Sequence, residues 1–464
     1  MKKNSLLKTI AIAFLVVVVL SWIIPTGSFS GTTYTESTTI PVGLINLFRL
    51  PVMTMQAFVQ YIVVFLSIGA FYGVLNKTGV YSDIVKDIAK KMKGKEKGLL
   101  IAVSIIFALI GSLTGLSTFG FFLVPFVAAI LLLSGYDKMT SLLATVGALL
   151  VGETASIFGF SGAGYVINIF TISMTDEIIT KIVLFILLTG LYVFFIAKNA
   201  KLVKNKKEEK IPFLVTDKAS KKSKMPLIVI GIIFIVISII GMYNWYYGWG
   251  IEVFNKLNES ISNVTIDEYP ILSNILYGIT VLGYWGNYEF SVAILIFSFI
   301  ISWIYNVKMD DMFDGIKNGV REIAPVAFYA TMANVVFTVM LSSQTNMYAT
   351  VLNWLNGIKS TFSIPVVALI SLTGSLFYND FYYLLSNAGG ILNAYEAIYY
   401  PITGVLVNGI YGIMMMILPT SVILVAGLRY FGIGYTEWLK KVWKYLLEAL
   451  IVLILITIIV TILI

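Results

Sequence analysis

Side chains capable of binding chemistry gather at a few points inside long apolar stretches of this sequence. Two matching Ser-Leu-Thr-Gly segments, 112–115 and 371–374, each stand in the middle of an apolar hairpin. Irregular backbone persists in hydrocarbon only where it is buried in protein or lines a wet cavity, because its polar groups must be paired. The amides that begin a following half-helix suit carboxylates, and hydroxyls and carbonyls suit Na⁺. The pair of segments therefore predicts two tips that line a binding site.

The candidate residues at the tips are hydroxyl, amide, glycine and carboxyl groups. They are Ser112, Thr114, Gly115, Ser117 and Thr118 at the first tip, and Ser371, Thr373, Gly374, Ser375, Asn379 and Asp380 at the second. Ser117 and Thr118 are expected to cap the helix after the first tip, and Ser375, Asn379 and Asp380 the helix after the second. For a single Ser or Thr, close helix packing is the better explanation, and Asp380 could be a helix cap alone. The two tips taken together favour a site.

Polar breaks in two long spans supply the remaining candidates. Gly152-Glu-Thr-Ala-Ser156 interrupts one span, while Asn408-Gly409, Gly412 and Pro419-Thr-Ser421 interrupt the other. Proline inside a helix removes an amide donor and clashes with the preceding turn, so a kink is expected there. An ionisable residue between apolar runs is by default a functional hypothesis, which singles out Glu153. The candidate site residues at the breaks are Glu153, Thr154, Ser156, Asn408, Thr420 and Ser421.

The composition limits the class of protein. Of 464 residues, 58% are hydrophobic and 12% are charged, whereas a soluble domain is about 25% charged. This excludes a soluble enzyme and a disordered chain, and predicts an all-α polytopic membrane protein. Cys and His are both absent, which excludes zinc, haem and disulfide sites and thiol or Ser–His catalysis. A phosphate-binding glycine motif is also lacking, so the chain is not expected to pump with ATP.

The net charge of +8 is unevenly distributed along the chain. Residues 198–224 hold ten Lys and three acids, 77–97 hold seven Lys and three acids, and 245–270 hold one Lys and four acids. Short lysine-rich loops remain in the cytoplasm. We therefore expect the N-terminus and the basic linker to be cytoplasmic and 245–270 to be external. The partner indicated is the lipid bilayer and not a nucleic acid, although a basic loop could also touch anionic lipid.

The hydropathy pattern places the membrane spans. They are expected at about 9–26, 55–76, 141–172, 182–197, 226–243, 288–306, 323–341, 401–426 and 446–464, with apolar hairpins at about 98–134 and 361–398. Amphipathic stretches at 80–97 and 344–360 precede the two hairpins. A Gly-x4-Gly helix follows each hairpin, at 147–152 and 404–409.

Three features in the same order predict a repeat. The first unit is 1–198 and the second is 286–464, joined by 199–285, which contains the basic linker, an extra span and the acidic outer loop. The lysine pattern places corresponding spans in opposite directions, so the repeats are inverted. Inverted repeats with broken helices are the architecture of secondary transporters, which bind substrate near the midplane. The expected fold is an inverted-repeat secondary transporter with two re-entrant hairpins.

The sequence resembles the YfcC-like branch of the C4-dicarboxylate carrier (DcuC-type) family, within the ion transporter superfamily. The resemblance is carried by Trp22-Ile-Ile-Pro-Thr-Gly-Ser-Phe29, Ile68-Gly-Ala-Phe-Tyr-Gly-Val-Leu-Asn-Lys-Thr-Gly79, Ser134-Gly-Tyr-Asp137, Pro419-Thr-Ser and Gly434-Tyr-Thr-Glu-Trp438. It implies inverted repeats, re-entrant hairpins, a mobile transport unit, and carboxylate or amino-acid substrates. Ser117-Thr118-Phe119 stands where relatives tend to have an acidic pair, and Phe158-Gly-Phe160 where they tend to have Asn-Pro-Phe. The resemblance therefore implies the fold and leaves the substrate open.

Charge favours one substrate class over another. Lys138, Lys181 and Lys359 are expected at loop ends, so a dicarboxylate would meet helix N-termini alone, each worth about half a positive charge, while facing Glu153 or Asp380. A small amino acid fits better, unless bound Na⁺ supplies the missing charge. The function expected is a symporter or exchanger in the plasma membrane, with a C4-dicarboxylate carrier as the alternative; a polytopic enzyme and a channel rank lower. No cofactor is expected, the coupling ion could be Na⁺ or H⁺, and the chain could form a homodimer.

Overall fold

A computed structural model describes residues 5–203, 211–214, 220–266, 269–275, 281–341, 346–359 and 361–464. Among these, eight helical segments are long and apolar enough to cross a membrane. They are 59–78, 96–114, 178–199, 225–242, 287–304, 309–340, 397–415 and 435–463. Many of their apolar side chains are exposed, for example Phe194, Ile232 and Leu455, as expected where lipid replaces water. The chain is an all-α, multi-pass membrane protein.

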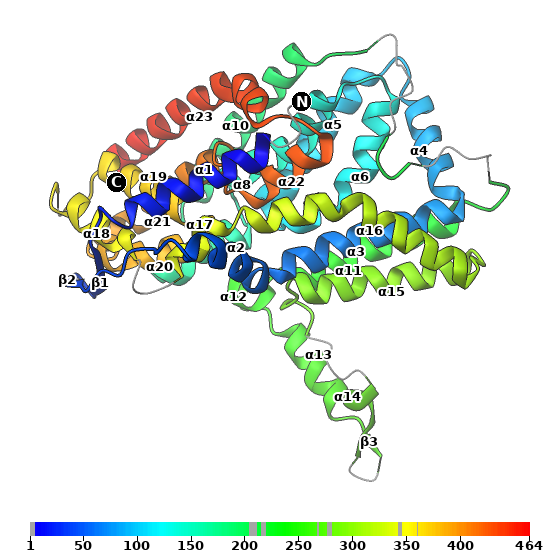
Figure 1. Ribbon diagram of the computed structural model, residues 1–464, viewed down its shortest axis with the longest axis horizontal. Helices are drawn as coiled ribbons and strands as arrows, with labels where there is room; N and C mark the ends of the chain where they lie inside the picture. Colours follow the sequence, from blue (N-terminus) through cyan, green and yellow to red (C-terminus); the bar gives the residue numbers. More distant parts are fainter. Residues whose placement is uncertain are drawn as a thin grey trace. The chain divides into compact units, whose positions relative to one another are not determined.

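The first half of the chain contains helices α1 to α10 and one β-hairpin (Figure 1). The elements are α1 (Ser5–Leu20), β1 (Thr26–Ser30), β2 (Thr33–Ser37), α2 (Asn46–Ala57), α3 (Val59–Thr78), α4 (Val80–Lys91), α5 (Glu96–Thr114), α6 (Ser117–Leu133), α7 (Lys138–Leu142), the π-helix η1 (Leu143–Gly147), α8 (Ala148–Thr154), the π-helix η2 (Phe160–Gly164), α9 (Tyr165–Phe170) and α10 (Ile178–Asn199).

The second half contains helices α11 to α23 and a short two-stranded pair. The elements are α11 (Met225–Met242), α12 (Trp245–Trp249), α13 (Val253–Ser262), β3 (Thr265–Ile266), β4 (Tyr269–Pro270), α14 (Ile271–Ile275), α15 (Asn287–Ile304), α16 (Met309–Met332), α17 (Val335–Met340), α18 (Met347–Asn356), α19 (Ile364–Phe377), α20 (Phe381–Leu392), the 3₁₀ helix η4 (Ala397–Tyr399), α21 (Tyr400–Met415), α22 (Val422–Phe431) and α23 (Tyr435–Leu463).

Most of the expected spans and both amphipathic stretches correspond to helices. The stretches at 80–97 and 344–360 contain α4 and α18. The lysines and acids at 204–210 and 215–219, which carry much of the charge of the basic linker, lie outside the described residues. The β1–β2 hairpin was not expected; it pairs antiparallel from Thr26–Ser37 to Ser30–Thr33.

The chain divides into two compact units. Unit 1 comprises 1–62, 88–210 and 325–464, and unit 2 comprises 63–87 and 211–324. This division concerns compactness and does not test the predicted repeat boundaries at 198 and 286, which stay a prediction.

Glycines set the closest helix contact in unit 1, where α5 packs along α8. A Cβ atom on Gly111 would lie 2.2 Å from the carbonyl oxygen of Leu149, and one on Gly152 would lie 1.9 Å from that of Ala108. Small residues allow helix backbones to touch in this way. The contact places the end of α8 directly against the end of α5, where the candidate residues lie.

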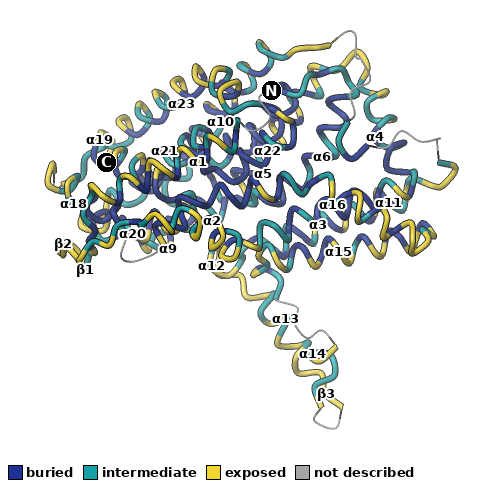
Figure 2. Tube along the Cα trace, viewed as in Figure 1, coloured by how far each residue is buried: buried dark blue, intermediate teal, exposed yellow. Residues whose placement is uncertain are grey.

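Unit 2 is built on a similar glycine contact between α3 and α16. A Cβ on Gly73 would lie 2.0 Å from the carbonyl oxygen of Gly315, and one on Gly319 would lie 1.9 Å from that of Gly69. Within this unit, α11 packs against α15, while α13, α14 and the β3–β4 pair project away from both (Figure 1) and are largely exposed (Figure 2).

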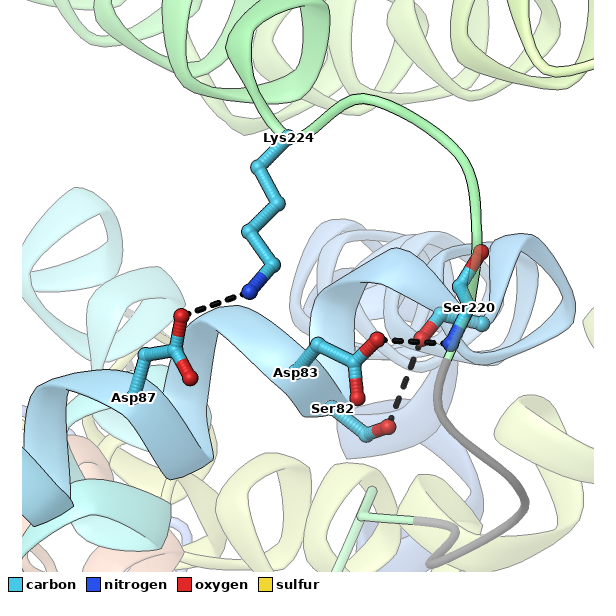
Figure 3. A network of polar contacts seen from close by, with 6 residues as sticks. Ser82, Asp83, Asp87, Ser220 and Lys224 are labelled. Carbon is cyan, nitrogen blue, oxygen red and sulfur yellow. Dashed lines mark hydrogen bonds and ion pairs between the residues drawn. The ribbon is translucent and has the colours of Figure 1, made fainter.

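The end of the linker is fastened to α4 in unit 2 (Figure 3). The amide of Ser220 donates a hydrogen bond to the carboxylate of Asp83 at 2.7 Å, and Lys224 pairs with Asp87 at 2.5 Å. These contacts bring the chain from the linker to the start of α11.

Two features of the predicted breaks are wrong in detail. The segment 371–374 is not a turn but lies within α19, and the chain turns at 378–380 instead; Gly374 packs against the ring of Tyr348, where a Cβ would lie 2.7 Å from the hydroxyl. Helix α21 also runs unbroken through Asn408-Gly409 and Gly412, and these two glycines lie against Leu453 and Thr154 of neighbouring helices. The break lies at 416–421, around Pro419.

Candidate functional site

The break after α8 is held by one residue at the end of α5. The carbonyl oxygen of Ser112 accepts hydrogen bonds from the three successive amides of 157–159, at 3.0, 3.1 and 2.9 Å. Its hydroxyl donates to the carbonyl of Ala155 at 2.6 Å and accepts from the amide of Ile157 at 3.1 Å. Backbone groups released by a helix break inside a membrane protein must find such partners. Ser112 therefore shapes the site, and its hydroxyl and carbonyl groups bond to backbone groups of the break.

The turn between α5 and α6 adjoins the same break. Gly115 ends α5 with φ of +66°, in the left-handed region that favours glycine, and Ser161 donates to its carbonyl at 2.9 Å. The expected capping by Ser117 and Thr118 is wrong: α6 has Leu116 as its N-cap, with no side-chain cap. The hydroxyl of Ser117 is instead bonded to a carboxylate on another helix.

That carboxylate belongs to Glu153, in the last turn of α8. It accepts the hydrogen bond of Ser117, and its backbone carbonyl accepts from the side-chain amide of Asn408 at 3.1 Å. Asn408 also reaches the carbonyl of Thr154 at 3.3 Å. Glu153 is thus hydrogen-bonded both to Ser117, at the turn between α5 and α6, and to Asn408 on α21. A binding site between the two predicted breaks needs such contacts from both sides.

A second polar cluster surrounds the turn between α19 and α20. The side-chain amide of Asn379 donates to the Oδ1 atom of Asn334 at 2.9 Å and to the carbonyl of Thr420 at 2.8 Å. Asn379 Oδ1 and Thr420 Oγ1 are buried and have no hydrogen-bond partner among the described residues. Asp380 caps α20 by accepting from the amide of Tyr383 at 3.3 Å, so its predicted capping role is confirmed.

Three tyrosines lie near the carboxylates of Glu153 and Asp380. Tyr61, Tyr165 and Tyr411 all lie within electrostatic range of Asp380, and Tyr411 lies within range of Glu153 as well. These tyrosines could not be predicted from the sequence, because tyrosine is common throughout the chain and its spacing here carries no signal. Together they give this region aromatic and acidic character.

A small cavity adjoins the break on α8. Its volume is about 20 Å³, and its polar lining comes from Thr154, Ser156, Asn408 and Lys181. Lys181 lies in the first turn of α10, next to the loop as expected, but it is only 7% exposed. The chain turns back between α9 and α10, so the ammonium group reaches the carbonyl of Met174 at 3.0 Å inside the protein.

The structure therefore brings together some of the candidates and separates others. Ser112, Gly115, Ser117, Glu153, Thr154, Ser156 and Asn408 meet around the break after α8, and Asn379, Asp380 and Thr420 meet around the second turn with Asn334. Thr114, Thr373 and Ser375 donate within their own helices, and Ser371 donates to the carbonyl of Val407. Thr118 and Ser421 are buried.

Long apolar helices around polar breaks define the class of this chain: a multi-pass membrane protein with a polar interior suited to small solutes. The comparison with protein families is more specific, since the model of the C4-dicarboxylate anaerobic carrier family matches residues 4–381. The chain belongs to this family and is a secondary transporter.

Other comparisons add less. The crystal structure of the YdaH transporter of Alcanivorax borkumensis is similar over 98% of both chains, with 14% sequence identity and a TM-score of 0.43. No curated protein gives a significant match.

Proposed function

We propose that this transporter moves a small carboxylate metabolite, with a C4-dicarboxylate as the first candidate, by alternating access across the plasma membrane. The observation that carries the proposal is the meeting of Glu153, Thr154 and Asn408 beside a small cavity that has a few polar side chains in a largely apolar lining, in a chain of the C4-dicarboxylate anaerobic carrier family. Binding between two helix breaks suits a carrier, because small movements of either helix can expose the ligand to one side.

A small amino acid is the second candidate. Glu153 and Asp380, with Tyr411 within electrostatic range of both, would favour an amino group, since carboxylates pair with ammonium groups and aromatic faces attract cations. A dianion would be repelled by the same two carboxylates. The two candidates therefore differ in the charge that the substrate presents to this acidic region: an amino acid presents its ammonium group, and a dicarboxylate presents a carboxylate.

The internal repeat is also part of the proposal. In both halves, the Ser of Ser-Leu-Thr-Gly donates to a backbone carbonyl in the segment that follows the hairpin: Ser112 to that of Ala155, just after α8, and Ser371 to that of Val407, within α21. In both halves the Thr two positions later donates within its own helix. The donors are matching residues of the two Ser-Leu-Thr-Gly segments, which supports two related units, and the lysine pattern supports their inversion.

The coupling ion is proposed to be H⁺ or Na⁺. Glu153 offers a protonatable group, whereas the unpaired oxygens of Asn379 and Thr420 suit Na⁺. Purified protein in liposomes should accumulate radiolabelled succinate when the correct gradient is imposed: inward Na⁺, inward protons or internal counter-substrate. Accumulation of an amino acid and not of succinate would select the second candidate, and uptake of neither class under all three gradients would contradict the proposal.

Orientation gives a separate prediction. We expect a cysteine at position 207 (Lys207→Cys) to be labelled only from the cytoplasm and one at position 259 (Glu259→Cys) only from outside, because lysine-rich loops remain inside. Labelling of intact cells and inverted vesicles with a membrane-impermeant maleimide measures this. The natural chain has no cysteine, so it is its own unlabelled control. Labelling of both positions from one side would refute the inverted orientation of the repeats.

A homodimer is proposed as the assembly, to be checked by the mass of the purified protein in detergent.

A further inference from the structure

We propose that Lys181 is the cationic group that binds a carboxylate of the transported substrate, in the cavity it shares with Thr154, Ser156 and Asn408. This inference rests on the proposed function in one respect, that the substrate bears a carboxylate. It holds for a dicarboxylate and for an amino acid alike, and it identifies the positive charge that the sequence did not locate.

Lys181 is buried to a degree that is rare for lysine. Its side chain is 7% exposed, and lysine is almost never fully buried unless it is paired. The ion pairs formed within 4.0 Å by the described residues do not include Lys181. Asp176 and Glu177 lie within electrostatic range of it, and each also accepts one hydrogen bond from another group: Asp176 from the amide of Ser173, and Glu177 from the hydroxyl of Thr180.

The ammonium group of Lys181 has more hydrogen-bond donors than its contacts with the described residues use. It carries three donors, and one is used by the carbonyl of Met174 at 3.0 Å. The other polar side chains around the cavity already donate to backbone carbonyls: Thr154 to Leu150, Ser156 to Gly159, and Asn408 to residues 153 and 154. Within the part of the chain that the structure describes, Lys181 is therefore the polar lining side chain with unused donors, and the ligand that suits it is an acceptor with negative charge.

The cavity has room for part of such a ligand. A volume of about 20 Å³ exceeds the roughly 10–15 Å³ that one water molecule needs, so it holds a group the size of a carboxylate oxygen. A water molecule there would accept a hydrogen bond but would not neutralise the charge. The rest of a substrate needs more space, so the residues facing Lys181 must separate during the transport cycle.

The position of the cavity connects Lys181 with the predicted site. Thr154 and Ser156 flank the break after α8, and Asn408 contributes the contact from α21. A carboxylate bound to Lys181 would therefore touch both helices that carry the breaks. This arrangement would let the substrate itself hold the two helices together.

Equilibrium binding to purified protein tests the proposal. Radiolabelled succinate and a set of radiolabelled amino acids are bound to the wild type, Lys181→Met, Lys181→Arg and Lys198→Met. Lys198 is the matched control because it lies on the same helix and is exposed. We expect Lys181→Met to weaken binding of the wild type's preferred ligand about tenfold or more, in keeping with loss of a charged hydrogen bond. Lys181→Arg should bind more tightly than Lys181→Met, and Lys198→Met should equal the wild type.

A thermal shift assay separates recognition from folding. The preferred ligand should raise the melting temperature of the wild type and of Lys198→Met, but not that of Lys181→Met. If Lys181→Met does not fold, Lys181→Gln replaces it in the same assays.

The outcomes distinguish the two proposals. Binding of an amino acid but not of succinate removes the first candidate substrate. The affinity of the Lys181 variants is then measured with that amino acid. Wild-type affinity in a folded Lys181→Met or Lys181→Gln overturns the role of Lys181 and leaves the proposed function standing. A wild type that binds no carboxylate at all overturns both.

Discussion

Replacing Gly152 with alanine is expected to leave little folded transporter. The new Cβ atom would lie 1.9 Å from the carbonyl oxygen of Ala108 and 2.7 Å from its carbonyl carbon. Both are backbone atoms, so no side-chain rotation can relieve the clash, and α5 and α8 must move apart. Overpacking of a core usually costs about 1–3 kcal/mol, and a clash with backbone belongs at the upper end of that range.

The measurement is thermal unfolding of the purified protein in detergent, followed by size-exclusion chromatography. Gly190→Ala is the matched control, because a Cβ on Gly190, in α10, meets no atom within 4 Å. Removing a helical glycine there should leave stability unchanged or slightly higher, since alanine is favoured over glycine by about 0.8–1.0 kcal/mol in helices. A Gly152→Ala protein as stable as Gly190→Ala would show that the helices are not in backbone contact.

The sequence predicts those parts of the site that depend on neighbouring residues. The break after α8 could be predicted because Gly, Thr and Ser follow one another around Glu153 inside an apolar run. The break at Pro419 could be predicted because proline cannot continue a helix. The capping by Asp380 could also be predicted, since a carboxylate before an apolar helix is a strong N-cap signal.

Features that depend on distant parts of the chain could not be predicted. Ser117 bonds to Glu153 and does not cap its own helix, because the packing of α5 on α8 brings that carboxylate closer than a local amide. Lys181 follows polar residues and therefore looks like a loop lysine, although the turn before α10 buries it. Asn334 could have been predicted, because it is a single amide within an apolar span.

Replacing Glu153 with glutamine is expected to reduce net uptake by about tenfold or more. The expectation follows from the two roles proposed for the charge of Glu153, which are proton coupling and pairing with an amino group of the substrate. A charged hydrogen bond contributes about 1.5–3 kcal/mol, and 1.4 kcal/mol corresponds to a factor of ten. The fold should persist, because the amide oxygen of glutamine can still accept from Ser117, and the backbone bond from Asn408 does not involve the side chain.

Exchange measurements then identify which role is correct. If Glu153 carries protons, Glu153→Gln should still exchange internal for external substrate but should not respond to a proton gradient. If Glu153 binds an amino group, exchange is lost together with uptake. Ser117→Ala removes the hydrogen bond but keeps the charge, so it should retain more uptake than Glu153→Gln. Glu437→Gln, at an exposed position on α23, should behave as the wild type. Uptake by Glu153→Gln equal to that of Glu437→Gln under every gradient would show that this intramembrane carboxylate takes no part in transport.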